Sequence, residues 1–213
     1  MMLATAKWVA LAAALLNGVR AQVASGYTDP ASGITFQGLT DSDTGFTIGI
    51  ALPETIGTDF IGQVILPLNN SAGWAGTSLG GGMTNSILLV AWPNAGEILT
   101  SFREATQTYA GDAALTLKTI PDGTYVNDTH MSLTYLCAGC ITGDASSFSS
   151  TDETAVLGYA FASTGPTGDS SDAEAELPFH DAGYSQFGVT LADAQSPDYD
   201  SWAGSAERSH EDV

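Results

Sequence analysis

Two residues of the 213-residue sequence lie in loops and could bind a haem iron. Met83 lies in the run Leu-Gly-Gly-Gly-Met-Thr-Asn at residues 79–85, where three glycines without a Cβ would let the backbone approach a large flat ligand. His180 lies in Leu-Pro-Phe-His-Asp at residues 177–181, where Pro178 stiffens the chain. A methionine and a histidine on separate loops are what a low-spin haem needs as axial ligands. Alone this pattern is weak, because a single methionine is usually core and a single histidine usually hydrogen-bonded.

The two cysteines of the chain form a Cys-Ala-Gly-Cys motif at Cys137 and Cys140. In an exported protein such a pair predicts a structural disulfide. A thioredoxin-like redox pair would need a βαβ context, and a zinc site would need two more ligands nearby; the sequence offers neither. Ile141 rather than histidine follows the motif, so a haem in this chain is expected to be a non-covalent haem b.

Hydrolytic chemistry has little support in the sequence. Besides His180, the histidines are His130 and His210. His130 precedes a strand whose apolar residues, beginning with Met131, alternate inward, so His130 is expected to point away from the core. The nucleophile, zinc-protease and phosphate-binding motifs are absent, and nothing marks a pair of carboxylates for a glycoside hydrolase.

Residues 1–21 have the features of a secretory signal peptide. Lys7 gives a positive start, residues 8–16 are apolar, and residues 19–21 end in a small-residue cleavage pattern that would leave Gln22 first. The apolar run is about ten residues, and a membrane-spanning helix needs about 20. The sequence therefore predicts a secreted, extracellular protein that does not associate with membranes.

Two sequons agree with export. Asn69 and Asn127 each begin an Asn-X-Ser/Thr motif, which predicts N-glycosylation and a surface position for both asparagines.

The chain is strongly acidic. Five Lys and Arg face 24 Asp and Glu, a net charge of −19. Removing Lys7 and Arg20 with the signal peptide leaves three cations and a charge of −21. Such a field argues against nucleic acid and anionic membranes as partners. Only 14% of residues are charged and 24 are glycine, which favours an all-β secreted domain over a disordered chain.

Short apolar segments separated by turns predict an all-β, antiparallel fold, since no segment has a clear helical period. Residues 70–82 and 163–176 are expected to be loops, and loops of this length are usually functional or disordered. We expect one domain over residues 22–192 and a flexible acidic tail over residues 193–213. The expected strands are residues 33–37, 46–51, 60–66, 86–92, 98–102, 115–120, 124–127, 130–137, 155–162 and 187–190.

Four motifs occur in a fixed order: Gly-Gly-Gly-Met-Thr-Asn at 80–85, Ala-Trp-Pro at 91–93, the cysteine pair at 137–140, and Pro-Phe-His-Asp at 178–181. In this order and spacing, the chain resembles the haem b cytochrome domain of fungal cellobiose dehydrogenases, from residue 27 to about residue 191. The resemblance implies an immunoglobulin-like antiparallel β-sandwich that binds haem between loops at one end.

The resemblance also implies roles for individual residues. Met83 and His180 occupy the positions of the axial ligands, Trp92 matches a tryptophan that packs beside the haem, and Tyr109 matches a tyrosine near a propionate. Arg103 is a candidate partner for that propionate. With both axial positions filled, the site favours electron transfer over oxygen activation, so we expect a redox partner rather than an enzyme.

The expected partners follow from the same resemblance. This chain ends before a flavin domain, so we expect a free-standing, monomeric cytochrome. An extracellular flavin dehydrogenase acting on sugars is the expected donor, and a copper polysaccharide monooxygenase in lignocellulose breakdown is the expected acceptor. The main alternative is a haem-free secreted sandwich that binds carbohydrate, with Trp74 and Trp202 as stacking platforms.

Overall fold

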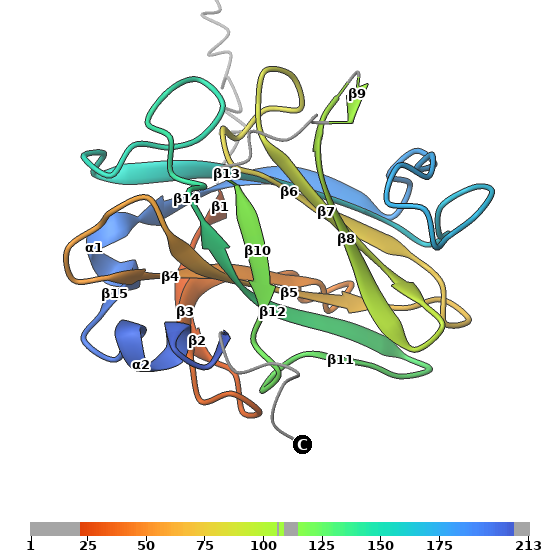
Figure 1. The fold of residues 1–213 in the computed structure, drawn as a ribbon, viewed down its shortest axis with the longest axis horizontal. Coiled ribbons are helices and arrows are strands. Elements are labelled where there is room, and N and C mark those ends of the chain that lie inside the picture. Colours follow the sequence, from red (N-terminus) through yellow and green to blue (C-terminus); the bar gives the residue numbers. More distant parts are fainter. Residues whose placement is uncertain (1–21, 106, 109–114, 207–213) are drawn as a thin grey trace, which may run out of the picture.

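The computed structural model describes residues 22–105, 107–108 and 115–206, which form two β-sheets packed as a sandwich (Figure 1). Strand pairs are antiparallel except β1 with β14 and β15 with β4. The predicted antiparallel β-sandwich is therefore confirmed.

One sheet has seven strands in the order β1-β14-β13-β6-β7-β8-β9. Their bounds are β1 Gln22–Val23, β6 Trp74–Ser78, β7 Leu88–Asn94, β8 Glu97–Glu104, β9 Gln107–Thr108, β13 Thr154–Ala162 and β14 Gly183–Thr190.

The other sheet has the order β10-β12-β5-β4-β3-β2, with β11 beside β12 and β15 beside β4. The bounds are β2 Ser25–Thr28, β3 Thr35–Thr40, β4 Thr47–Pro53, β5 Phe60–Pro67, β10 Thr116–Thr119, β11 Tyr125–Val126, β12 His130–Ala138 and β15 Gln195–Ser196. Two short helices, α1 Leu191–Ala194 and α2 Tyr199–Ala203, follow β14.

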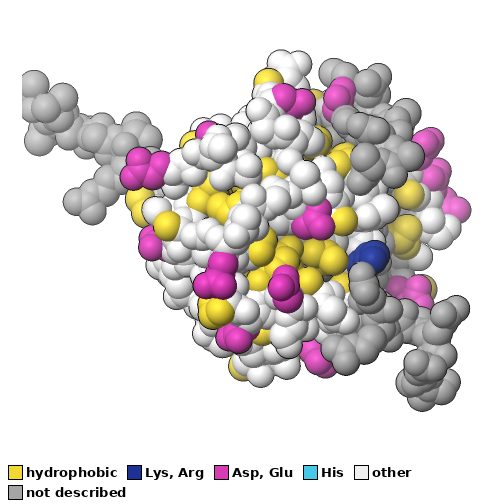
Figure 2. All heavy atoms as spheres, turned by 60° about the vertical axis from the view of Figure 1, so that its left-hand side comes forward, with side chains coloured by type: hydrophobic (Ala, Val, Ile, Leu, Met, Phe, Trp, Pro, Cys, Tyr) yellow, Lys and Arg dark blue, Asp and Glu magenta, His cyan; other side chains and the backbone are white. Residues whose placement is uncertain are grey.

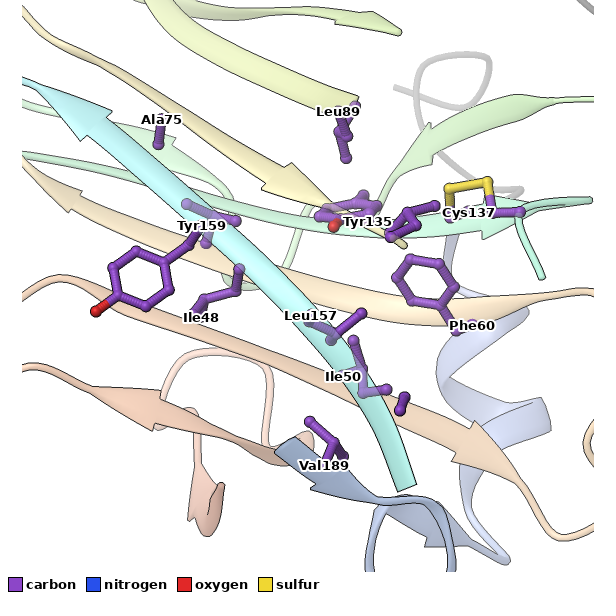
Figure 3. Packing of buried hydrophobic residues seen from close by; sticks show 14 of the residues in the cluster. Ile48, Ile50, Phe60, Ala75, Leu89, Tyr135, Cys137, Leu157, Tyr159 and Val189 are labelled. Carbon is purple, nitrogen blue, oxygen red and sulfur yellow. A yellow bond between two sulfur atoms is a disulfide. The ribbon is translucent and has the colours of Figure 1, made fainter. Parts of the chain in front are cut away.

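The main core lies between the two sheets. Because side chains of a strand alternate between its faces, each sheet sends every second residue inward. Burial of these side chains excludes water from the sandwich and supplies most of its stability. Figure 3 shows Ala75, Leu89, Leu157, Tyr159 and Val189 of the seven-stranded sheet packing against Ile48, Ile50, Phe60, Tyr135 and Cys137 of the other.

Strand β6 corrects the expectation of a loop over residues 70–82. Its sequence, Trp-Ala-Gly-Thr-Ser, lacks the β-branched alternation that marks a strand. It is nevertheless fully buried between β13 and β7, and these two neighbours pair with its backbone on both sides. Its small residues suit a crowded central position, which is a tertiary requirement that local sequence does not reveal.

The end of the chain also differs from expectation. The flexible tail expected from residue 193 is wrong for residues 193–206, where α1, β15 and α2 pack against the sandwich. Tyr199 and Ala206 are buried in a second cluster, and Trp202 packs against it. A few spaced apolar side chains in an otherwise polar segment are enough to fix it. Residues 207–213 lie outside the described part.

Cys137 and Cys140 form the predicted disulfide, with an S–S distance of 2.02 Å, and both are buried. Asn69 and Asn127 are exposed, as the sequons require. The two turns that carry them are neighbours, because the Leu68 amide donates to the Thr129 carbonyl over 2.7 Å.

The surface in Figure 2 carries many Asp and Glu side chains and very few Lys or Arg. Within the described ranges, no helix is long and apolar enough to cross a membrane.

Candidate functional site

A cavity of about 990 Å³ lies on the outer face of the seven-stranded sheet. This is at the upper end of the range of about 300–1,000 Å³ typical of ligand sites. Its floor consists of outward-facing residues of β6 and β13, where Gly76 pairs with Ala160 and Ser78 with Gly158. These four small residues leave a low, flat surface in the middle of the sheet.

Neighbouring strands supply the walls. On β7, Val90 pairs with Gly76 and Leu88 with Ser78, so both face the cavity. On the other side, the β14 residues Tyr184 and Gln186 pair with Ala160 and Gly158 of β13 and line it as well. The cavity thus has an apolar wall on one side and an aromatic and amide wall on the other.

The Met83 loop, residues 79–87, borders the cavity between β6 and β7. Gly81 has a φ of +79°, and a Cβ on it would lie 2.9 Å from the Val156 carbonyl oxygen of β13. The Gln186 side-chain amide donates to the Gly81 carbonyl over 2.6 Å. Gly82, by contrast, has no neighbour closer than 3.7 Å to such a Cβ.

Glycine is therefore suited to positions 81 and 82 of this loop for two different reasons. Gly81 is needed for the loop's own close packing on the sheet, whereas Gly82 borders the cavity with open space beside it, as the predicted approach of a ligand would require. Met83 itself lines the cavity and is 61% exposed, so its thioether is accessible from this space.

The His180 loop, residues 163–182, connects β13 to β14 and covers part of the outer face of the sheet. It lies at the right-hand side of Figure 1. Three side chains of the sheet donate hydrogen bonds to its backbone carbonyls: Trp92 Nε1 to Ser170 at 2.8 Å, Arg103 to Ala173 at 2.9 Å, and Trp74 Nε1 to Pro178 at 3.1 Å.

The His180 imidazole lines the cavity and is surrounded by aromatic rings. The Phe179 ring lies 4.2 Å away, Tyr184 4.6 Å away and Trp74 6.4 Å away, the last two edge-on. His180 Nδ1 is buried and has no hydrogen-bond partner among the described residues. Such an unpaired nitrogen costs about 1–3 kcal/mol unless it pairs with a group outside the described residues.

Carboxylates outnumber cations among the described residues that line the cavity. Arg103 is the one cation among the described residues that line it, with the carboxylates of Glu104, Glu174 and Glu176. Partial burial lowers the pKa of Arg103, and the nearby Asp172 and Glu174 carboxylates oppose this shift. Arg103 stays charged and can meet an anionic group at the cavity wall.

The structure thus brings three of the sequence candidates, Met83, His180 and Arg103, to one cavity. Trp92 is fully buried and does not line the cavity; it lies beneath the His180 loop with the Arg103 guanidinium 5.5 Å from its ring. Its role beside a haem stays a prediction. Tyr109 lies outside the described residues.

The position of the cavity and the surroundings of Trp74 both differ from what the sequence led us to expect. Loops border the cavity, but its floor is the outer face of a sheet rather than one end of the sandwich. Trp74, expected only as a sugar-stacking platform, lies beside His180 and is 6% exposed. The pairing of Trp74 with a loop 104 residues away leaves no signal in the local sequence.

Residues 27–201 match the family described as the cytochrome domain of cellobiose dehydrogenase. The chain belongs to this family. Its structure is similar to the cytochrome domain of Myriococcum thermophilum cellobiose dehydrogenase, with a TM-score of 0.75 and 38% identity over 87% of this chain and 97% of the other. It is also similar to the cytochrome b domain of Coprinopsis cinerea pyranose dehydrogenase, with a TM-score of 0.73 and 30% identity over 86% and 95%.

A curated relative agrees with these matches. The pyrroloquinoline quinone-dependent pyranose dehydrogenase of Coprinopsis cinerea is 33% identical over 183 residues, which are 81% of this chain. The chain spans only 24% of that protein's length. Membership in the family makes this chain a cytochrome domain, which implies an electron-transfer module with a haem site.

The residues of this cytochrome domain fit a haem. The floor of small residues would be filled by any larger side chain, and the cavity above it carries a thioether and an imidazole. A thioether and an imidazole are the axial donor set of low-spin cytochromes.

Proposed function

We propose that the chain is a secreted b-type cytochrome in which Met83 and His180 are the axial ligands of a non-covalent haem. The observation that carries the proposal is that both side chains border one cavity above a floor of glycine, serine and alanine. When bound, the haem supplies reversible one-electron chemistry.

The chain's own residues set the conditions of that chemistry. The Met83 thioether is a weak donor that favours the ferrous state and raises the reduction potential. His180 is the stronger donor, and its imidazole contacts the rings of Phe179 and Tyr184. If Met83 and His180 both held the iron, they would leave small molecules no open position on it, which would favour electron transfer.

Arg103 has a separate role in the proposal. It lines the cavity among carboxylates, and we assign it to the haem propionate, since a guanidinium pairs well with a carboxylate. Tyr109 is proposed as a second propionate partner.

The proposed donor is an extracellular sugar dehydrogenase and the proposed acceptor a copper polysaccharide monooxygenase. The similar cytochrome domains belong to dehydrogenases named for cellobiose and pyranose, which supports a donor of this class, with flavin or quinone as its cofactor. Secretion is supported by the apolar leader, the disulfide and the two exposed sequons.

The carbohydrate-binding alternative loses its support. Trp74 is buried and bonded to the Pro178 carbonyl, so it has no free face for a sugar ring. Trp202 packs against the cluster that contains Tyr199.

Two measurements test the proposal. The protein purified after haem-replete expression should show an intense Soret band, which sharpens on reduction with split α and β bands. In stopped flow, a sugar dehydrogenase with its substrate should reduce the cytochrome, and a copper monooxygenase should reoxidise it. A colourless protein, or one that neither partner reduces or oxidises, would sink the proposal.

A further inference from the structure

We propose that Trp74 and Ser163 are positioning residues for His180: they hold the backbone on either side of this residue and so set where its imidazole lies. The inference rests on the proposed function, in which His180 binds the iron.

The usual way of fixing a metal-binding histidine is missing at His180. Such a histidine normally donates its other ring N–H to a carbonyl or carboxylate, which sets both tautomer and ring orientation. Across the described residues, His180 Nδ1 has no such partner. The orientation of the ring must therefore come from the packing of its neighbours and from the backbone that carries it.

On the N-terminal side of His180, Trp74 holds the chain. Its Nε1–H donates to the Pro178 carbonyl over 3.1 Å, two residues before the histidine. The indole is 6% exposed on the central strand β6, and its ring meets the imidazole edge-on at 6.4 Å. The Pro178 carbonyl shares a planar peptide bond with the Phe179 amide, so this hydrogen bond restrains the chain directly before His180.

On the C-terminal side, the next residue is held twice. The Asp181 carboxylate accepts hydrogen bonds from the Ser163 amide at 3.0 Å and the Ser163 hydroxyl at 3.1 Å. The Asp181 amide donates to the Phe179 carbonyl at 2.9 Å, and the Ala182 amide donates to Phe161 at 3.3 Å. His180 therefore lies at the tip of a tight turn whose second side is tied to the end of β13.

Trp92 and Arg103 hold the same loop further away. They bond to the carbonyls of Ser170 and Ala173, ten and seven residues before His180. Their contacts fix the first part of the loop, so the loss of either should affect the imidazole less than the loss of Trp74.

The test uses Trp74→Phe, which keeps an aromatic ring but removes the N–H donor, and Ser163→Ala, which removes one of two donors to Asp181. Trp202→Phe is the matched control, because it changes a half-buried tryptophan on α2. Haem transfer from each protein to excess apomyoglobin measures the haem dissociation rate. We expect the haem dissociation rate to rise about three- to ten-fold in Trp74→Phe and in Ser163→Ala, which corresponds to the loss of one hydrogen bond. Both variants should also show a larger high-spin fraction on warming.

A second readout does not need haem. Hydrogen exchange of the Asp181 and Ala182 amides in the haem-free protein should be faster in both variants and unchanged in Trp202→Phe. Faster exchange without faster haem loss would overturn the positioning role, as would wild-type values in both assays or an equal effect of Trp202→Phe. If the wild-type protein binds no haem, the proposed function fails, and unchanged exchange rates would separately overturn the two restraints.

Discussion

Gly158 of β13 and Gly81 of the Met83 loop are in such close contact that a Cβ on Gly158 would lie 2.6 Å from the Gly81 carbonyl oxygen. The contact is between backbone and backbone, so no side chain can move to make room. It fixes the height of the Met83 loop above the sheet, and with it the place of the thioether at the cavity.

Gly158→Ala should therefore displace the Met83 loop. We expect a loss of about 1–3 kcal/mol in the free energy of unfolding, typical of an overpacked site, together with a partial loss of bound haem. Urea unfolding and the ratio of Soret to protein absorbance measure the two effects. Gly57→Ala is the control, since a Cβ there has no neighbour within 4 Å. An unchanged Soret ratio in Gly158→Ala would show that this contact does not set the loop.

Ala160→Phe tests whether haem binding requires small residues in the floor of the cavity. Ala160 lies in the floor of the cavity, and a phenyl ring there would occupy the space above Gly76. We expect a folded protein that binds little or no haem, by haem titration and far-ultraviolet circular dichroism. Thr154→Phe is the matched control, because Thr154 lies on the same strand and face, is exposed and does not line the cavity. If Ala160→Phe bound haem as well as the wild type does, the haem would not lie above this cavity floor.

The disulfide should stabilise the fold without affecting the haem. Cys137 and Cys140 are buried in the main core and do not line the cavity. Replacing both by alanine should cost about 2 kcal/mol in the free energy of unfolding, as expected for a loop this short, and should leave the absorption spectrum unchanged. A changed spectrum would mean that the disulfide is coupled to the haem site.

Asp144 should make the loop beside the site sensitive to acid. Its carboxylate accepts hydrogen bonds from the Ser146 amide and hydroxyl and from Thr142, and these lower its pKa. Its stabilising effect is then fully present above the unfolded-state pKa of about 3.9 and is lost as pH falls through the lower folded-state value. The Ser146 carbonyl accepts from the Ile87 amide at the end of the Met83 loop, so this turn supports the site.

Asp144→Ala should reduce stability at pH 6 by about 0.5–1 kcal/mol, a small value because water screens the exposed carboxylate. The difference from wild type should shrink as pH falls toward 3. Ser146→Ala should give a smaller effect with the same pH dependence. A difference that stays constant from pH 6 to 3 would contradict this assignment.

How far the sequence predicts this molecule depends on whether a feature is local. The alternation of Met131 with the following strand residues predicts β12, and Met131 is fully buried; the polar Ser132 and Thr134 on its other face are buried as well. Met83 and His180 can be identified as site candidates from the sequence, because the glycines, the proline and the other residues that mark their loops are next to them in the chain. Strand β6 and the role of Trp74 depend on partners about 85 and 104 residues away, which no local period encodes. The packed segment 193–206 likewise has no local signal, because only a few spaced apolar residues hold it.

The absorption spectra of Met83→Ala and His180→Ala test most directly whether Met83 and His180 together bind one haem. Met131→Leu and His130→Ala are the controls, since they change the same residue types away from the cavity. We expect a low-spin spectrum with split α and β bands in the reduced wild type and both controls. Met83→Ala and His180→Ala should each lose it, becoming high-spin or haem-free. A low-spin spectrum that survives in either variant would remove that residue from the site.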